Sequence, residues 1–214
     1  MTKITTAITM CLVAITLNAQ HLTSFEGENG KYGFKDVKTK KIVIPAKYDV
    51  VEEFYGVLAN VCLNQKCGFI DITGKEVIPL KYDYTDIFYD GLANVRLNGK
   101  SGFVDITGKE VIPLKYDDAN IFYKGLAAVK LNEKWGYINK TGKEVISFKY
   151  DVAGNFYQEL AMVHLNNKWG YVDTTGKVAI PIKYELAHNF DEGRALVKLK
   201  GKTFYIDKTG KEVK

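Results

Sequence analysis

Residues 131–149 read LNEKWGYINKTGKEVISFK, and variants of this stretch recur along the chain. The glycine that follows its tryptophan has equivalents spaced 35, 34, 34 and 34 residues apart. These glycines are Gly33, Gly68, Gly102, Gly136 and Gly170. A sixth, truncated copy begins at Lys202 and carries Phe204 in the glycine position. Because a period of this size is typical of solenoids, propellers and arrays, the sequence predicts tandem copies of one small unit.

Each unit has the pattern of three β-strands and two tight turns. Residues 92–106, LANVRLNGKSGFVDI, are two β runs around an Asn-Gly pair, which tolerates the positive φ of a two-residue hairpin turn. A Thr-Gly turn follows, and residues 110–117, EVIPLKYD, form the third run. Pro113 cannot donate to a ladder, so we expect the third strand at a sheet edge or at a bulge. The unit is thus predicted to be a three-stranded antiparallel β-meander of about 34 residues.

The faces of the predicted hairpin indicate how the units pack. One face of residues 92–105 is apolar and the other is about half apolar, which suits small sheets stacked face to face. We expect an all-β, propeller-like or toroidal array, with an open β superhelix as the alternative. A lone strand near residues 22–25 could complete the last sheet if the array closed. A phenylalanine recurs in every long connection and is expected to anchor it in the core: Phe54, Phe88, Phe122, Phe156 and Phe190.

Residues 1–19 lie outside the repeats and have the pattern of a secretory signal peptide. Lys3 precedes an apolar run at residues 7–17, and small Ala19 follows the run. A buried first strand is the rival interpretation. We expect an exported protein, in the periplasm, on the cell surface or secreted. Residues 20–214 would then be a single β domain with about five full repeats and a truncated sixth.

Composition limits the classes of partner. The formal net charge is +5, and acidic residues are interspersed with the basic ones, so nucleic acid is not an expected partner. After residue 19, no apolar run approaches the roughly 20 residues of a membrane helix. The 14 Tyr and 11 Phe against only 4 Pro favour β structure.

The repeated motif resembles a known family. Residues 134–137 and 168–171 both read KWGY, and each is followed by a Thr-Gly-Lys turn and a Lys-Tyr-Asp or Lys-Tyr-Glu segment. In this the chain is similar to the bacterial WG-repeat, or KWG-repeat, family over nearly all of residues 30–214. The resemblance implies a β-rich repeat protein, often exported, that acts in binding and has no shared catalytic activity. Tyr32, Cys67, Ser101 and Thr203 depart from the motif in the tryptophan position.

Residues that could carry catalysis or bind a metal do not converge in the sequence. The histidines are His21, His164 and His188, which fall near the predicted cleavage site, in a strand and in a connection. The aspartates of the Thr-Gly-Lys turns lack the alternating pattern of a calcium loop. No nucleophile elbow, phosphate loop or zinc-protease motif occurs. We expect no enzyme activity, no metal site and no cofactor.

Aromatic residues are the better candidates for a contact surface. The Lys-Tyr-Asp segments recur in every copy, which favours a packing role over a ring of ligand-binding side chains. Aromatic positions that are not shared by all copies are therefore the predicted binding residues: Trp135, Tyr137, Tyr157, Trp169 and Tyr171. The expected function is an exported scaffold that binds a protein, peptide or glycan. The alternative is a structural or assembly component of the bacterial envelope.

Cys62 and Cys67 are expected to face each other across a hairpin. If Asn64-Gln65 is the two-residue turn, Leu63 pairs with Lys66 and the next pair outward is Cys62 with Cys67. Such a pair has Cα atoms about 4.5 Å apart, which permits a disulfide. Two unlinked cysteines are the alternative.

Overall fold

The structure, a computed structural model, describes residues 21–213, and every strand ladder in this part of the chain is antiparallel. No helix occurs among these residues. The strands are β1 (Leu22–Glu26), β2 (Tyr32–Asp36), β3 (Ile42–Tyr48), β4 (Val50–Val51), β5 (Ala59–Leu63), β6 (Lys66–Ile70), β7 (Glu76–Tyr82), β8 (Tyr84–Thr85), β9 (Leu92–Leu97), β10 (Lys100–Asp105), β11 (Glu110–Tyr116), β12 (Asp118–Ala119), β13 (Leu126–Leu131), β14 (Lys134–Asn139), β15 (Glu144–Tyr150), β16 (Val152–Tyr157), β17 (Leu160–Leu165), β18 (Lys168–Asp173), β19 (Val178–Tyr184), β20 (Leu186–Ala187), β21 (Arg194–Leu199), β22 (Lys202–Asp207) and β23 (Glu212–Val213).

These strands form one sheet of three strands, β1-β2-β3, and five of four strands, of which β4-β5-β6-β7 is typical. The predicted meander is present, and each later sheet gains a first strand from the preceding connection, which has two residues in every case except β16. In β4 this strand pairs through only Val50↔Cys62 and Val51↔Val61. Two paired residues are too few to give an alternating pattern, so the sequence did not reveal this strand.

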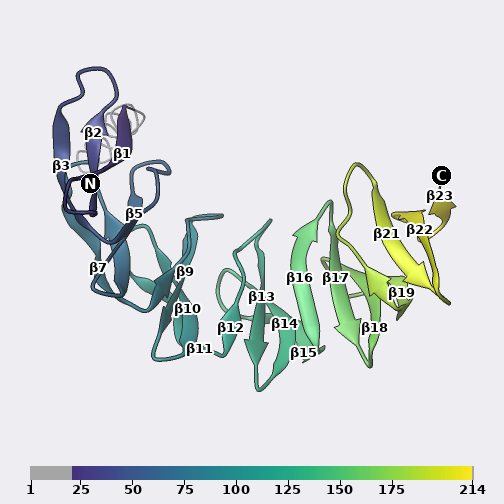
Figure 1. Ribbon diagram of the computed structural model, residues 1–214. Coiled ribbons are helices and arrows are strands. Elements are labelled where there is room, and N and C mark those ends of the chain that lie inside the picture. Colours follow the sequence, from purple (N-terminus) through teal and green to yellow (C-terminus); the bar gives the residue numbers. More distant parts are fainter. Residues whose placement is uncertain (1–20, 214) are drawn as a thin grey trace, which may run out of the picture. The chain divides into compact units, whose positions relative to one another are not determined.

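The chain divides into two compact units. The first contains residues up to 88, 95–99 and 104–109, and holds the sheets β1–β3 and β4–β7. The second contains residues 89–94, 100–103 and 110–214. In the second unit the sheets β12–β15, β16–β19 and β20–β23 follow one another along the chain (Figure 1).

The hairpins have the predicted register. In β13 and β14, Val129 pairs with Gly136 and Leu131 pairs with Lys134, which leaves a two-residue turn. Both turn residues, Asn132 at φ 50 and Glu133 at φ 64, are left-handed. A turn with two left-handed residues has a backbone twist that matches the twist of the flanking strands. This explains why Asn or Gly is favoured in the turn.

The third strand of the repeat bulges over the recurring glycine. A Cβ added to Gly102 would lie 2.6 Å from the Ile112 carbonyl oxygen and 2.8 Å from the Leu114 nitrogen. The register shifts at the corresponding place in β6/β7, β14/β15 and β18/β19. In the last sheet, β22 pairs with only two residues of β23, so no such bulge crosses Phe204. The third strand is the sheet edge, and the prediction of an edge or bulge at proline is confirmed.

The phenylalanines of the connections pack in the core as predicted. Phe103 and Phe122 have ring centroids 4.7 Å apart, and Tyr171 and Phe190 have centroids 4.9 Å apart. Phe122, Phe156 and Phe190 are buried, and Phe54 and Phe88 are partly buried. In each pair, the phenylalanine of the connection packs on an aromatic ring of the sheet that precedes the connection. These pairs therefore hold one sheet against the next.

Buried asparagine side chains join one sheet to the short first strand of the next. The Thr85 hydroxyl donates to Asn60 Oδ1 at 2.8 Å, and Asn60 Nδ2 donates to the Thr85 carbonyl at 3.0 Å. In the next repeat, Asn94 Nδ2 donates to the Ala119 carbonyl at 2.6 Å, but Asn94 Oδ1 has no hydrogen-bond partner among the described residues. Alanine lacks the hydroxyl that threonine supplies.

The Thr-Gly-Lys turns are closed by their preceding acidic or amide side chain. Asp105 Oδ1 accepts hydrogen bonds from the Thr107 hydroxyl at 2.6 Å, the Thr107 amide at 2.9 Å and the Lys109 amide at 3.1 Å. The Thr107 hydroxyl is the main cause that lowers the pKa of Asp105 below its ordinary value. Asn139 Oδ1 makes the same three contacts in its own repeat. These side chains therefore cap the turns.

The N-terminal strand belongs to the first sheet. β1 pairs with β2 from Leu22↔Asp36 to Glu26↔Tyr32, so the expectation that a strand near residues 22–25 would complete the last sheet is wrong. A short hairpin brings β1 to β2 with a small loss of chain entropy, whereas a distant sheet would require closure of a long loop. The predicted signal peptide lies outside the described residues. Within residues 21–213, no helix has the length and apolar character needed to cross a bilayer.

Candidate binding surface

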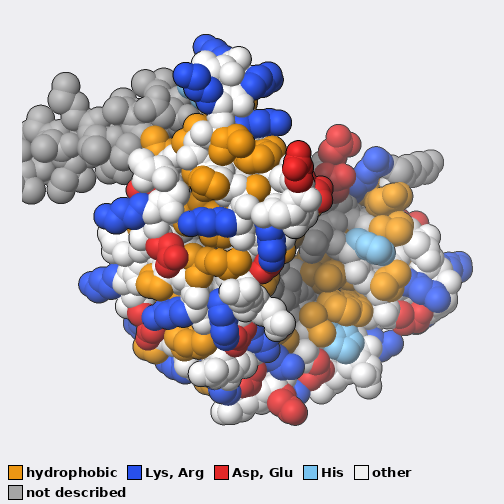
Figure 2. All heavy atoms as spheres, turned by 60° about the vertical axis from the view of Figure 1, so that its left-hand side comes forward, with side chains coloured by type: hydrophobic (Ala, Val, Ile, Leu, Met, Phe, Trp, Pro, Cys, Tyr) orange, Lys and Arg blue, Asp and Glu red, His pale blue; other side chains and the backbone are white. Residues whose placement is uncertain are grey.

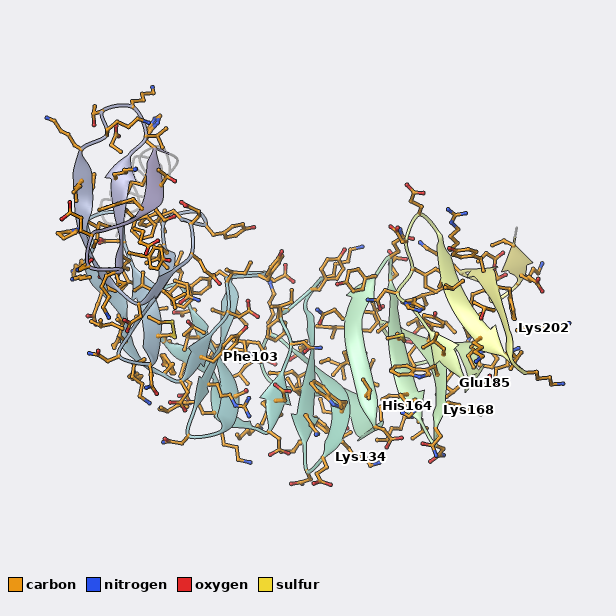
Figure 3. All side chains as sticks on the ribbon, viewed as in Figure 1. Phe103, Lys134, His164, Lys168, Glu185 and Lys202 are labelled. Atoms are coloured by element: carbon orange, nitrogen blue, oxygen red, sulfur yellow. A yellow bond between two sulfur atoms is a disulfide. The ribbon has the colours of Figure 1, made fainter. Side chains whose placement is uncertain are left out.

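Two of the five predicted contact residues are buried. The exposed fractions of Tyr137 and Tyr171 are 0% and 1%. The Tyr137 hydroxyl donates to the Gly154 carbonyl at 2.8 Å, and burial raises the pKa of both phenols. Phe103 occupies the same position one repeat earlier and is also buried (Figure 3). Because both side chains are buried, Tyr137 and Tyr171 are not placed to contact a ligand, contrary to the expectation from the sequence.

The two tryptophans are half-buried. Trp169 lies across the strand pair from His164, and the two rings have centroids 4.6 Å apart. Trp135 packs against the neighbouring hydrophobic core. Tyr157 is the one predicted contact residue that is exposed, at 44%.

The Lys-Tyr-Asp segments hold each hairpin together. Tyr150 is buried, and Lys149 Nζ lies 5.2 Å from the centre of its ring. Asp151 pairs with Lys134 Nζ at 2.5 Å and accepts from the Asn166 amide in the next hairpin turn at 3.1 Å. The Lys134 contact is the main cause that lowers the pKa of Asp151. A packing role is therefore the better interpretation of the recurring Lys-Tyr-Asp segments.

The last hairpin uses a variant of this arrangement. Glu185 stands in the aspartate position, and its carboxylate accepts from the Gly201 amide at 3.2 Å. Lys134, Lys168 and Lys202 each begin the second long strand of their hairpin (Figure 3).

Exposed tyrosines recur at a second tight turn, and of these only Tyr157 was predicted as a contact residue. This turn follows the recurring phenylalanine of each connection and reads Phe-Tyr-x-Gly-Leu in two copies, at residues 88–92 and 122–126. Isolated β-bridges join its ends, as in Tyr89↔Leu92 and Tyr123↔Leu126. Successive side chains point in opposite directions, so the phenylalanine enters the core and the tyrosine faces outward. The signal that could have revealed this surface was the tyrosine that follows four of the five recurring phenylalanines.

In the second unit, we call Tyr89, Tyr123 and Tyr157 the tyrosine row. Tyr89 and Tyr157 are 37% and 44% exposed, and Tyr123 is partly buried. The rings of Tyr123 and Tyr157 stack with centroids 6.5 Å apart. Asp90 Oδ2 accepts from the Gly125 amide at 2.7 Å, which joins the first two turns. The three turns therefore form one continuous surface.

Charged side chains flank the tyrosine row. Lys124 Nζ lies 6.0 Å from the centre of the Tyr123 ring and 3.8 Å from Glu159. Lys140 Nζ donates to the Asp90 carbonyl at 2.6 Å. On the face shown in Figure 2, basic and acidic side chains are interspersed with hydrophobic ones. The tyrosine row therefore offers aromatic rings beside Lys124, Lys140 and Glu159.

The predicted cysteine pair is formed in the first unit. Cys62 pairs with Cys67 in the β5/β6 ladder, with Cα atoms 4.0 Å apart, and a disulfide joins the two sulfurs. Cys67 thus occupies the position that a half-buried tryptophan holds in later repeats.

The described residues contain no cluster of three or more His, Cys, Asp or Glu side chains placed to hold a metal ion. His164 Nδ1 lies 3.7 Å from Asp151. His188 lies in the last sheet, where it lines a hollow with Arg194 and Tyr205.

The sequence profile of the WG containing repeat matches five consecutive segments, residues 32–67, 68–100, 102–135, 135–169 and 169–202. The chain belongs to the WG-repeat family. A comparison of this WG-repeat protein with curated proteins finds no match.

Solved structures resemble the WG-repeat protein in fold alone. A eukaryotic initiation factor matches with a TM-score of 0.60 and 14% identity over 92% of this chain. The WG-repeat protein spans 62% of the length of that chain. Hsv2 from Kluyveromyces lactis matches with a TM-score of 0.51 and 8% identity, covering 89% of this chain and 72% of the other. Together with the repeated small antiparallel sheets, these likenesses confirm an all-β, propeller-like array.

Proposed function

We propose that this WG-repeat protein is an exported, non-enzymatic scaffold that binds a protein, peptide or glycan through the tyrosine row. The observation that supports it is the outward tyrosine repeated at adjacent turns in the second unit. Tyrosine combines a large apolar ring with a polar hydroxyl and has few rotatable bonds, so it loses little entropy when a ligand binds. The fold does not need tyrosine at these outward positions for packing, so the side chains are available to a ligand.

A structural or assembly role is the second candidate. The edge strands carry exposed apolar side chains, including Ile42 at 62%, Val43 at 42% and Val178 at 43%. Exposed edges and apolar side chains favour contact between chains. A stable oligomer of the isolated protein in light scattering would favour this role over the scaffold.

The test uses residues 20–214 on arrays of glycans and peptides. A variant with serine at Tyr89, Tyr123 and Tyr157 should lose binding by at least about tenfold, because aromatic anchors dominate such contacts. Tyr84→Ser is the matched control, since Tyr84 is 47% exposed but lies outside the row. Unchanged binding by the triple variant would refute the proposed surface.

Export is tested separately by the intact mass of protein from its native host. The expected mature chain begins at Gln20 or within a few residues of it. Retention of residues 1–19 in all of the protein would contradict this part of the proposal.

A further inference from the structure

The last sheet, β20–β23, contains a small hollow with a volume of about 260 Å³. The strands β21 and β22 of this sheet lie in the yellow C-terminal region of the ribbon (Figure 1). Its lining residues are His188, Asn189, Asp191, Arg194, Leu196 and Tyr205. Most of these side chains are polar, and none belongs to the tyrosine row.

The hollow lies where the repeat pattern changes. Asp191 stands where the four earlier turns have tyrosine, and Arg194 stands where they have leucine. The leucine is mostly buried in those copies, as Leu92 at 7% and Leu160 at 8% show, whereas Arg194 is exposed. Tyr205 is 40% exposed, although its counterparts in earlier repeats are buried. At this turn the last sheet therefore presents an exposed arginine beside an exposed tyrosine, where the earlier sheets have a leucine and a buried aromatic ring.

Backbone contacts fix the positions of these side chains. The Asp191 amide donates to the Arg194 carbonyl, and the Arg194 amide donates to the Asp191 carbonyl, both at 2.9 Å. The His188 amide donates to the Leu196 carbonyl at 3.0 Å. The His188 carbonyl accepts from the buried Tyr171 hydroxyl at 2.6 Å. The rim of the hollow is therefore anchored to the core.

The side chains leave hydrogen-bonding capacity for a ligand. The Arg194 guanidinium lies 5.0 Å from the centre of the Tyr205 ring, so it covers part of one aromatic face. Within residues 21–213, neither Asp191 nor Arg194 takes part in a salt bridge. Asp191 can accept hydrogen bonds, Arg194 can donate several, and the Asn189 amide can do both.

These features define the chemistry of the ligand. The charges of Arg194 and Asp191 cancel, so the site does not favour a strongly charged ligand. The planar side chains of Arg194, Asp191 and Asn189 can pair with neighbouring hydroxyl groups of a ligand. The Tyr205 ring can pack against an apolar C–H face of the same ligand. The volume is slightly below the usual range for small-molecule sites, which suits a single ring. We propose that the hollow is a saccharide-binding site that takes one neutral sugar unit.

The test measures binding of methyl glycosides to the folded protein. Methyl glycosides of glucose, galactose, mannose and N-acetylglucosamine, in both anomeric forms, are titrated into ¹⁵N-labelled residues 20–214. At least one should shift the amide signals of Asn189 and Arg194 in a saturable manner. No saturable shift with any of the glycosides would overturn the proposal.

The decisive variant restores the residues of the earlier repeats. Asp191→Tyr with Arg194→Leu should abolish saccharide binding and keep the thermal midpoint, because both residues occur at these positions in the other sheets. If this variant does not fold, His188→Asn with Asn189→Ile restores the residues of β12–β15 in the same way and should weaken binding at least tenfold. Saccharide binding unchanged in a folded restored variant would refute the site.

A control separates this site from the tyrosine row. The serine variant of Tyr89, Tyr123 and Tyr157 should bind the methyl glycoside with the affinity of the wild type. Loss of saccharide binding in that variant would assign the sugar to the tyrosine row and overturn the separate site. The tyrosine-row proposal could therefore fail while this one stands.

Discussion

Gly102→Ala should destabilise the protein because the third strand leaves no room for a methyl group. The added Cβ would lie 2.6 Å from the Ile112 oxygen and 2.8 Å from both the Leu114 nitrogen and the Pro113 carbonyl carbon. All three atoms belong to the backbone, so no side-chain rotation relieves the overlap. Ordinary contacts of a Cβ begin near 3.4 Å, and the bulged strand must shift by the difference. Overpacking of this kind costs about 1–3 kcal/mol, and we expect the upper half of that range.

Gly154→Ala is the matched control. The nearest atoms to its added Cβ are the Met162 oxygen at 3.6 Å and Asn189 Oδ1 at 3.8 Å, and the residue has no left-handed φ. The substitution should stabilise by about 0.4–1 kcal/mol, because alanine reduces the entropy of the unfolded chain. Exposed Lys109→Ala should change stability by less than about 0.5 kcal/mol.

Urea unfolding of the three variants gives the measurement, since a change of midpoint at constant slope reports a change of stability. The midpoint should fall for Gly102→Ala and rise slightly for Gly154→Ala. Equal midpoints for the two glycine variants would refute the argument that the bulge requires glycine.

Three further predictions concern stability and redox state. Ala119→Thr should satisfy Asn94 Oδ1 and stabilise by about 0.5–1.5 kcal/mol in urea unfolding, whereas Ala153→Thr, which faces no asparagine, should destabilise. The pKa of Asp105 is lowered in the folded state, so its contribution to stability is present above the unfolded pKa of about 3.9 and is lost as pH falls through the folded pKa. Asp105→Asn should therefore reduce the loss of stability between pH 5 and pH 2. An unchanged dependence of the unfolding free energy on pH would contradict this. Non-reducing peptide mapping of the exported protein should recover the hairpin disulfide, and free alkylatable thiols at both cysteines would exclude it.

Much of the fold follows from local rules that are visible in the sequence. Each hairpin is set by two residues that accept positive φ, and the position of Pro79 indicates an edge strand. Four of the five added first strands escaped prediction because only two residues of each, such as Val50 and Val51, join a ladder, whereas β16 has six residues. Their positions depend on tertiary contacts and not on a local pattern.

The candidate surface was harder to predict, because exposure depends on what the next sheet covers. Tyr137 and Tyr157 are both strand tyrosines, yet the connection covers the first and leaves the second in solvent. The sequence does show that Arg194 replaces a recurring leucine. Only the structure shows that it shares a hollow with Tyr205.

The clamp between lysine, aspartate and hairpin turn has a consequence for how such a chain can change its length. Lys134 reaches Asp151, and Asp151 holds the turn at Asn166, so each polar contact spans about half of one copy. Removal of residues 118–151 would join Asp117 to Val152 in the same register as any other junction. Every clamp would then find an equivalent partner in the neighbouring copy. Duplication or loss of a gene segment that encodes 34 residues therefore leaves these clamps matched, and the number of copies can vary by whole units during evolution without breaking them.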